Sequence, residues 1–176
     1  MKPARVLLIG MMGAGKTSVG RALEARTGWP YRDNDETVAE VEGIPTAELL
    51  KRDGPDALRA AESRALSRVL ERDPPLVAGV AGGVIESPQD RERLASPNAF
   101  VVYLHAPIEV LVKRVGSGEG RPWLQPDPET AMRRLFDGRD PLYREVADLV
   151  VESQEGDAEQ LAEQILAALE RWSPSR

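Results

Sequence analysis

A glycine-rich stretch near the start of the chain, Gly10–Thr17, has residue types and a spacing suited to holding phosphate groups. It reads Gly-Met-Met-Gly-Ala-Gly-Lys-Thr, so a Lys-Thr pair directly follows the last glycine. Glycines let the backbone turn so that several N–H groups point inward at phosphate oxygens. Lys16 would reach the β- and γ-phosphates, and the Thr17 hydroxyl would ligate Mg²⁺. The stretch therefore predicts binding of a nucleoside triphosphate with magnesium.

The segments on either side of this stretch are those of a P-loop. An apolar run, Arg5–Ile9, precedes it and a helical pattern, Ser18–Arg26, follows it. This strand–loop–helix order is the context that the motif requires, and it disfavours a chance glycine-rich turn. The positive end of the helix dipole would strengthen the attraction for phosphate. We expect the nucleotide to contact Gly13, Ala14, Gly15, Lys16, Thr17 and Ser18.

Two carboxylates follow the second predicted strand, which spans residues 30–32. The alternation of side chains along an extended segment would aim Asp33 and Asp35 the same way. A carboxylate here could hold Mg²⁺ through water or accept a proton from a substrate hydroxyl. The alternative is a turn at the end of a strand, with solvated acids.

Several later residues could meet an anionic second substrate. Arg59 lies in the first turn of a predicted helix, where the dipole disfavours a cation unless an anionic ligand is present. Glu62 is within reach to orient it, although a solvated surface arginine is a fair alternative. Arg121 ends a flexible polar segment, as expected for the arginine of a lid in phosphoryl transfer. Arg139 adds a second cation, and Gly82–Gly83 would allow a ligand to approach the backbone closely.

Length and composition indicate one domain that spans residues 1–176. They disfavour a membrane protein and a nucleic-acid-binding protein. The chain is 41% apolar and 30% charged, and it has no apolar run near the roughly 18 residues that a membrane helix needs. The net charge of −6 argues against nucleic acid as a partner. No cysteine is present, which excludes thiolate metal sites and a cysteine nucleophile. We expect a cytoplasmic monomer that acts on small molecules.

Helical and strand patterns alternate along the chain, which predicts an α/β fold with a parallel sheet. The helical region 36–70 is interrupted at 43–45 and 53–55, with Asp56 as a cap for its last part. A later helix runs from Asp127 to about Gly138, and Pro141 starts a short turn. The predicted strands cover residues 5–9, 30–32, 76–80, 100–104 and 149–151.

Taken in order, these motifs resemble those of the shikimate kinase family. That family has a P-loop, an Asp-x-Asp after the second strand, a Phe-Arg-x-x-Glu, a Gly-Gly-Gly after the third strand, an Arg-Pro-Leu-Leu in the lid and an Arg-x-Pro-Leu-Tyr. The resemblance runs from Val6 to about Leu169 with similar spacing. It implies the P-loop NTPase three-layer sandwich, with a five-stranded sheet in the order 2-3-1-4-5 and a mobile lid at about 116–127.

The resemblance also implies an activity, namely the ATP-dependent phosphorylation of the 3-hydroxyl of shikimate with Mg²⁺ as cofactor. The catalytic residues would be Lys16, Asp35 and Arg121, with Asp35 as the base and Arg121 touching both substrates. Arg114 would lie near the adenine, and Asp33 would assist the metal through water. The acceptor would contact Asp35, Arg59, Gly82, Gly83 and Arg139, with the two arginines on its carboxylate.

Three residues depart from the family pattern: Leu58 replaces a phenylalanine, Ala81 replaces the first glycine and Trp123 replaces a lid leucine. Ala81 adds a methyl group where a positive φ would favour glycine. A related kinase that acts on gluconate or another polyhydroxy acid or cyclitol is therefore the alternative. A switch GTPase is disfavoured because the chain has no Asn-Lys-x-Asp motif. His105 is interpreted as a polar strand end and 152–155 as a solvated loop that could border the adenine.

Overall fold

Five parallel strands form one sheet in the order β2-β3-β1-β4-β5. The structure is a computed structural model, and it describes residues 4–95, 98–118, 124–154 and 156–173. The strands are β1 (Arg5–Ile9), β2 (Tyr31–Arg32), β3 (Leu76–Gly79), β4 (Phe100–His105) and β5 (Leu149–Glu152). The predicted strand order and the α/β fold class are confirmed.

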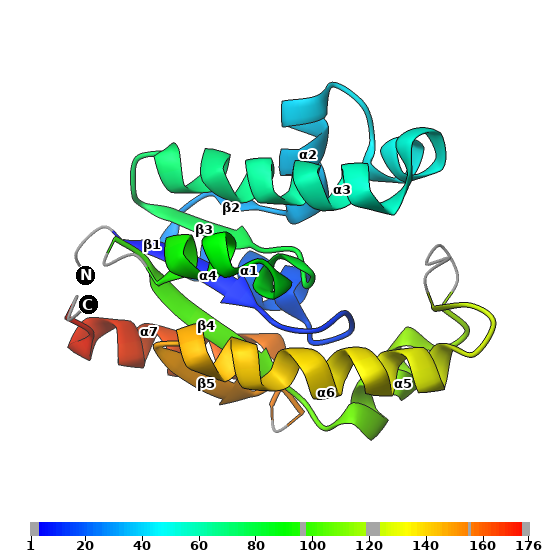
Figure 1. The fold of residues 1–176 in the computed structure, drawn as a ribbon. Helices are drawn as coiled ribbons and strands as arrows, with labels where there is room; N and C mark the ends of the chain where they lie inside the picture. Colours follow the sequence, from blue (N-terminus) through cyan, green and yellow to red (C-terminus); the bar gives the residue numbers. More distant parts are fainter. Residues whose placement is uncertain (1–3, 96–97, 119–123, 155, 174–176) are drawn as a thin grey trace.

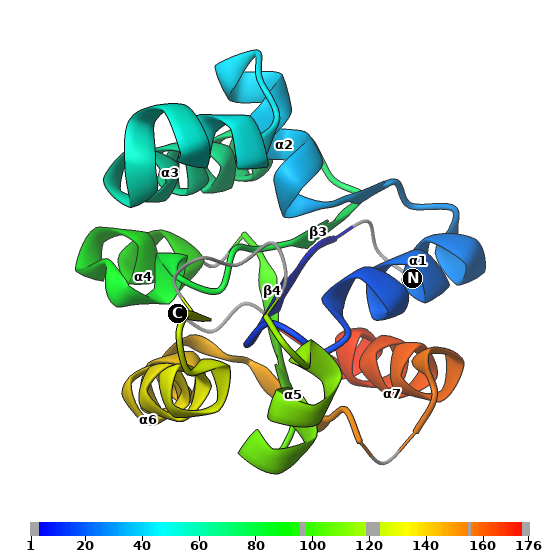
Figure 2. The ribbon, with the colours of Figure 1, turned by 90° about the vertical axis from the view of Figure 1, so that its right-hand side faces the viewer.

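Helices cover both faces of this sheet. Those in the described residues are α1 (Lys16–Thr27), α2 (Asn34–Glu42), α3 (Thr46–Glu71), α4 (Pro88–Leu94), α5 (Ile108–Val115), α6 (Pro128–Val146), α7 (Ala158–Arg171) and a short 3₁₀ helix, η1 (Val84–Glu86). Helices α1 and α7 lie on one side of the sheet, and α4 and α6 lie on the other (Figure 2). Helices α2 and α3 pack against each other beside β2 and β3 (Figure 1). The result is a three-layer sandwich.

The neighbouring strands β1 and β4 are buried over nearly their whole length because helices cover them on both sides. Residues 6–9 of β1 and 100–104 of β4 expose at most 2% of their surface. A strand buried on both faces reads as a continuous apolar run rather than an alternating one. The apolar runs of β1 and β4 therefore reflect burial on both faces of the sheet.

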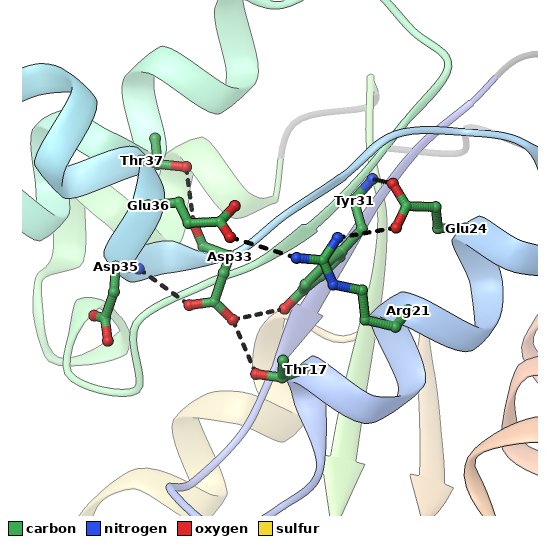
Figure 3. Close-up of polar contacts among 8 residues, drawn as sticks. All are labelled: Thr17, Arg21, Glu24, Tyr31, Asp33, Asp35, Glu36 and Thr37. Carbon is green, nitrogen blue, oxygen red and sulfur yellow. Dashed lines mark hydrogen bonds and ion pairs between the residues drawn. The ribbon is translucent and has the colours of Figure 1, made fainter.

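The residues that cap the helices decide where the acidic pair after β2 lies. Asp33 is the N-cap of α2, and its side chain accepts a hydrogen bond from the backbone N–H of Asp35 at 3.1 Å. Helix α2 therefore starts at Asn34, two residues earlier than predicted. Asp35 lies in the first helical turn, so the strand-like alternation predicted for the two carboxylates is wrong. Their side chains point in different directions (Figure 3).

Helix α6 does not end near Gly138 as predicted but continues to Val146 through Pro141. Proline has a fixed φ that is compatible with a helix, and it costs the helix one backbone hydrogen bond and a local clash. The turn beyond it buries Tyr143 and Val146, whose packing compensates for that loss. The continuation matters because it places Arg139 inside a helix rather than at its end.

Helix α3 has one interruption rather than a capped restart. Gly54 has a φ of 84° and a ψ of −178°, and the chain is helical on both sides of it. The non-helical residue is thus Gly54, and Asp56 lies within the second helical part instead of capping it. Gly43 ends α2 in the left-handed conformation, as the predicted break indicated. A small separate core between α2 and α3 is formed by Val38, Leu49, Leu58, Ala61 and Ala65.

The predicted lid at 116–127 is described only in part, because residues 119–123 lie outside the described residues. Helix α5 ends at Val115, and Gly116, with a φ of 62°, caps its C-terminus. Leu124 is completely buried and belongs to the main core. The movement of this segment therefore stays a prediction. Within the described ranges, no helix is long and apolar enough to pass through a membrane.

Candidate active site

The P-loop connects β1 to α1 with the backbone that the motif predicts. Gly13 and Gly15 have φ values of 81° and 95°, a region that favours glycine. Helix α1 begins at Lys16, so its first free N–H groups and positive dipole end face the loop. The Lys16 ammonium donates hydrogen bonds to the carbonyl oxygens of Gly10, at 2.8 Å, and Met11, at 3.0 Å. The lysine is thus held across the mouth of the loop.

A cavity of about 470 Å³ opens beside the P-loop. Its walls are residues 13–19, Arg114 from α5, and the segment that leads into α7. The Arg114 guanidinium donates to the carbonyl oxygens of Gly13, at 3.1 Å, and Ser153, at 3.2 Å. Ser153 is only 4% exposed, so the prediction of a solvated loop at 152–155 is wrong for this residue. This cavity brings together all the predicted nucleotide-binding residues that belong to the described part of the chain.

A second cavity, of about 430 Å³, lies next to the first. It is lined by Asp33, Asp35, Arg59, Gly82, Gly83 and Arg139, which come from four different parts of the chain. Residues Gly13, Lys16 and Thr17 line both cavities. Two adjoining compartments therefore lie at the carboxyl ends of β1, β2 and β3, and they meet at the P-loop.

Asp33 joins the P-loop to the second compartment. One of its carboxylate oxygens, Oδ2, accepts hydrogen bonds from the hydroxyls of Thr17, at 2.9 Å, and Tyr31, at 3.0 Å (Figure 3). Asp33 is thus hydrogen-bonded to Thr17, the other residue predicted to serve the metal. Tyr31 was missed by sequence reasoning. Its position two residues before Asp33 in an extended segment would have placed it on the same side of the strand.

Arg59 lies over the second compartment, where Glu62 orients it. Its Nη1 donates to Oε2 of Glu62 at 2.6 Å, as the spacing on the helix predicted. Burial raises the pKa of Glu62 above its ordinary value, and the positive charges of Arg59 and Arg139 act against that rise. A Cβ atom at Gly83 would lie 1.8 Å from Nη1 of Arg59. The guanidinium therefore lies directly against the glycine backbone.

Arg139 is only 2% exposed, and a charged side chain is rarely buried so fully unless it has a partner. Its Nε donates to Oε1 of Glu86 at 3.1 Å, and Glu86 belongs to η1. The Tyr143 hydroxyl, one turn further along α6, donates to the carbonyl oxygen of Gly82 at 2.6 Å. Glu86 was missed because it is 53 residues from Arg139 in the chain and no local pattern connects them.

The remaining predicted residues have different outcomes. Arg121 and Trp123 lie outside the described residues. Ala81 lines the second compartment, and no described non-glycine residue has a positive φ, so this position does not need a glycine for its backbone conformation. His105 lies in neither compartment, and its Nδ1 is 2.7 Å from Oε2 of Glu152.

Residues 12–170 match the family model described as shikimate kinase. A shikimate kinase from Psychrobacter sp. (strain PRwf-1) is 36% identical over 170 residues, which cover 96% of this chain and 93% of that protein. The chain belongs to the shikimate kinase family. Membership makes it a kinase, an enzyme that transfers phosphoryl groups.

Solved structures agree with this assignment. Shikimate kinase from Acinetobacter baumannii in complex with shikimate is 35% identical, has a TM-score of 0.88, and the match covers 97% of this chain and 94% of that chain. A gluconokinase from Sinorhizobium meliloti has a TM-score of 0.63 with 24% identity, covering 96% and 93%. The second similarity concerns the fold alone. With the Acinetobacter baumannii enzyme, this chain shares both sequence and fold.

Proposed function

We propose that this protein transfers the γ-phosphoryl group of ATP to the 3-hydroxyl of shikimate and so produces shikimate 3-phosphate. The observation that carries the proposal is the second compartment. It combines two guanidinium groups, from Arg59 and Arg139, with the Asp35 carboxylate beside the P-loop. A carboxylate-bearing polyol matches this set of groups. The relative from Acinetobacter baumannii was solved in complex with shikimate, and this supports the choice of acceptor.

The donor compartment would hold ATP through backbone N–H groups and two cations. Residues 13–18 would contact the phosphates, and Lys16 would exchange its bonds to the loop carbonyls for the β- and γ-phosphates. Arg114, fixed by Gly13 and Ser153, would lie against the adenine. Its planar guanidinium group is suited to stacking on an aromatic base.

The described residues fit a magnesium ion that is held mostly by water and phosphate. No group of three or more His, Cys, Asp or Glu side chains in the described parts of the chain could hold a metal by itself. Mg²⁺ needs no such cage, because it keeps several waters and binds one or two protein oxygens with substrate phosphates. The Thr17 hydroxyl can donate its proton to Asp33 and still offer a lone pair to the ion. When bound, the ion would neutralise charge on the phosphates.

The acceptor compartment would hold shikimate by its carboxylate and its hydroxyls. Arg59 and Arg139 would bind the carboxylate, because guanidinium groups stay charged and match its geometry. Gly82 and Gly83 would lie against the ring. Asp35 would bind a hydroxyl and accept its proton as the oxygen attacks phosphorus. Catalysis would then consist of positioning the two substrates and stabilising charge on the moving group.

Arg121 completes the proposal as the lid arginine that touches both substrates. Its role rests on the family pattern Arg-Pro-Leu-Leu, since the residue lies outside the described part. We further infer a cytoplasmic monomer that acts on small molecules. Light scattering on a size-exclusion column would test the oligomeric state.

A coupled assay of ADP release would test the function with shikimate and gluconate as parallel acceptors. We expect turnover with shikimate only, and ³¹P NMR should show the phosphate on the 3-hydroxyl. Turnover with gluconate or a cyclitol but not shikimate would contradict the proposed acceptor. No acceptor-stimulated ADP release at all would contradict the kinase proposal itself.

A further inference from the structure

Tyr31 is an aromatic residue on β2 whose ring is seated between two glycines. A Cβ atom at Gly20 of α1 would lie 2.1 Å from Cε2 of the ring. A Cβ atom at Gly79 of β3 would lie 2.8 Å from the phenolic oxygen. Both distances are shorter than non-bonded atoms allow, and Tyr31 is only 1% exposed. The absence of side chains at the two glycines therefore leaves the space that the ring and its hydroxyl occupy.

The rest of Tyr31 is fixed as well as its ring. Its backbone N–H donates to Oε1 of Glu24 at 2.9 Å, and the Arg21 guanidinium lies 5.1 Å from the centre of the ring. Arg21 in turn is paired with Glu24, at 3.0 Å, and with Glu36, at 3.4 Å (Figure 3). The backbone hydrogen bond, the close fit against Gly20 and the contact with Arg21 together fix the ring, so its hydroxyl reaches one position.

That place is Oδ2 of Asp33, the same carboxylate oxygen that accepts the hydroxyl of Thr17. The other oxygen, Oδ1, accepts the backbone N–H of Asp35. Three donors from three directions thus fix both oxygens of one carboxylate. Two of these donors, Thr17 and Asp35, belong to segments proposed to contact the metal or the acceptor. Tyr31 itself lines the second compartment, and its hydroxyl interacts with both Asp33 and Thr17, the two residues proposed to serve the metal.

We propose that Tyr31 is a positioning residue, whose hydroxyl holds the Asp33 carboxylate in the orientation that the magnesium–nucleotide complex requires. The inference rests on the proposed function for the role of Asp33. Mg²⁺ demands near-ideal octahedral geometry, so groups that orient its water ligands influence its affinity strongly. Loss of such an outer partner typically lowers metal affinity 10- to 100-fold.

The first test is the Tyr31→Phe variant, which removes the hydroxyl and keeps the ring between the glycines. We expect the Mg²⁺ concentration for half-maximal activity to rise about tenfold, while the KM for shikimate stays unchanged. Isothermal titration calorimetry with ADP gives a readout independent of turnover. In EDTA, the variant should bind ADP as tightly as the wild type does. The increase in ADP affinity that Mg²⁺ causes should be about tenfold smaller in the variant.

Tyr103→Phe is the matched control. Tyr103 is also 1% exposed, and its hydroxyl donates to a carboxylate, Oδ1 of Asp140, at 2.9 Å. It lines neither compartment. This variant loses a comparable hydrogen bond, so its melting temperature should fall as that of Tyr31→Phe does. Its Mg²⁺ dependence should not change.

A second variant, Gly79→Ala, tests the same hydroxyl from the opposite side. Its methyl group would lie 2.8 Å from the Tyr31 oxygen but 3.7 Å or more from the ring carbons. The hydroxyl must therefore leave its present position, which disturbs its hydrogen bond to Asp33, so Gly79→Ala should raise the Mg²⁺ requirement like Tyr31→Phe. In the double variant the methyl meets no hydroxyl, so the second change should add no further increase.

Three results would overturn the inference. One is an Mg²⁺ response of Tyr31→Phe equal to that of the wild type in both the assay and the calorimeter. Another is a rise of the same size in the Mg²⁺ requirement of Tyr103→Phe. The third is a double variant in which the increases in Mg²⁺ requirement of the two single variants add up. Since the ADP titration needs no acceptor, failure of shikimate turnover would contradict the proposed function without deciding this inference.

Discussion

Gly83 and Arg59 lie so close together that no side chain fits between them. A Cβ atom at Gly83 would come within 1.8 Å of Nη1 and 2.1 Å of Cζ of the guanidinium. Arg59 reaches this position from α3, where Glu62 holds the same Nη1 at 2.6 Å. The glycine therefore determines where the positive charge of Arg59 faces the acceptor compartment, although it carries no chemical group of its own.

Gly83→Ala should weaken acceptor binding without unfolding the protein. The methyl group would displace the far end of a flexible side chain, which costs little stability but moves the guanidinium. We expect the KM for shikimate to rise about tenfold, because the acceptor would lose roughly one charge-assisted hydrogen bond. The KM for ATP should stay the same in steady-state assays.

Gly138→Ala is the control for this substitution. A Cβ atom at Gly138 has no neighbour within 4 Å, and the residue is inside α6. Alanine should therefore raise the free energy of unfolding by about 0.5–1 kcal/mol and leave both KM values unchanged. An unchanged shikimate KM in Gly83→Ala would mean that the displaced arginine does not bind the acceptor.

Glu86→Ala should show that the buried Arg139 needs its carboxylate partner. Glu86 is half exposed, while Arg139 is buried, so loss of the pair leaves a buried cation less well compensated. We expect the KM for shikimate to rise several-fold and thermal stability to fall. Glu86→Gln keeps an oxygen that can accept the Nε hydrogen bond, so it should give a smaller effect.

Glu109→Ala provides the comparison for Glu86, because Glu109 pairs with Arg133 on the surface. Exposed pairs contribute little, so this variant should resemble the wild type in both stability and kinetics. If Glu86→Ala behaved in the same way as Glu109→Ala, Arg139 would be positioned by the rest of α6 alone.

Lys16→Ala should abolish turnover while leaving the fold intact. The ammonium group is the proposed stabiliser of charge on the transferred phosphoryl group, and loss of one such group typically lowers kcat by 100-fold or more. The loss of its two bonds to loop carbonyls should lower stability only slightly. Single-turnover measurement of ADP formation checks the chemical step. A kcat within tenfold of the wild type would contradict the role of Lys16.

Asp140→Asn should reveal a pH-dependent contribution to stability away from the site. Partial burial acts to raise the pKa of Asp140, but hydrogen bonds from Arg144 and Tyr103 outweigh it and leave the pKa below its ordinary value. A carboxylate whose pKa is lowered in the folded state stabilises the folded protein at pH values above its unfolded pKa of about 3.9. This stabilisation is lost as the pH falls through the lower, folded pKa.

Urea unfolding at several pH values measures this contribution. At pH 7, Asp140→Asn should be less stable than the wild type by about 1–2 kcal/mol. The difference should shrink as the pH falls from about 4 through the lowered pKa of folded Asp140, because protonation then removes the charge of this carboxylate in the wild type too. A difference that stays constant over this range would show that the carboxylate charge is not involved.

The parts of the site that were predictable are those whose signal is contained in neighbouring residues. The P-loop needs Gly13, Gly15 and Lys16 in one short stretch between a strand and a helix, so its spacing alone indicates its backbone. The Arg59–Glu62 pair also follows from helical spacing. The course of α6 was not predictable, because the packing of Tyr143 and Val146 outweighs the local effect of Pro141.

By itself, the sequence determined the parallel sheet, the triphosphate site and the family, because strands, loops and motifs depend on residues that are close in the chain. Only the tertiary structure decided which partner holds each side chain of the site. The ends of β2 and β3 and the helices α3 and α6 bring Glu86 to Arg139, Gly83 to Arg59, and Asp33 to Thr17. Contacts between residues so far apart in sequence follow from packing, which no local pattern encodes.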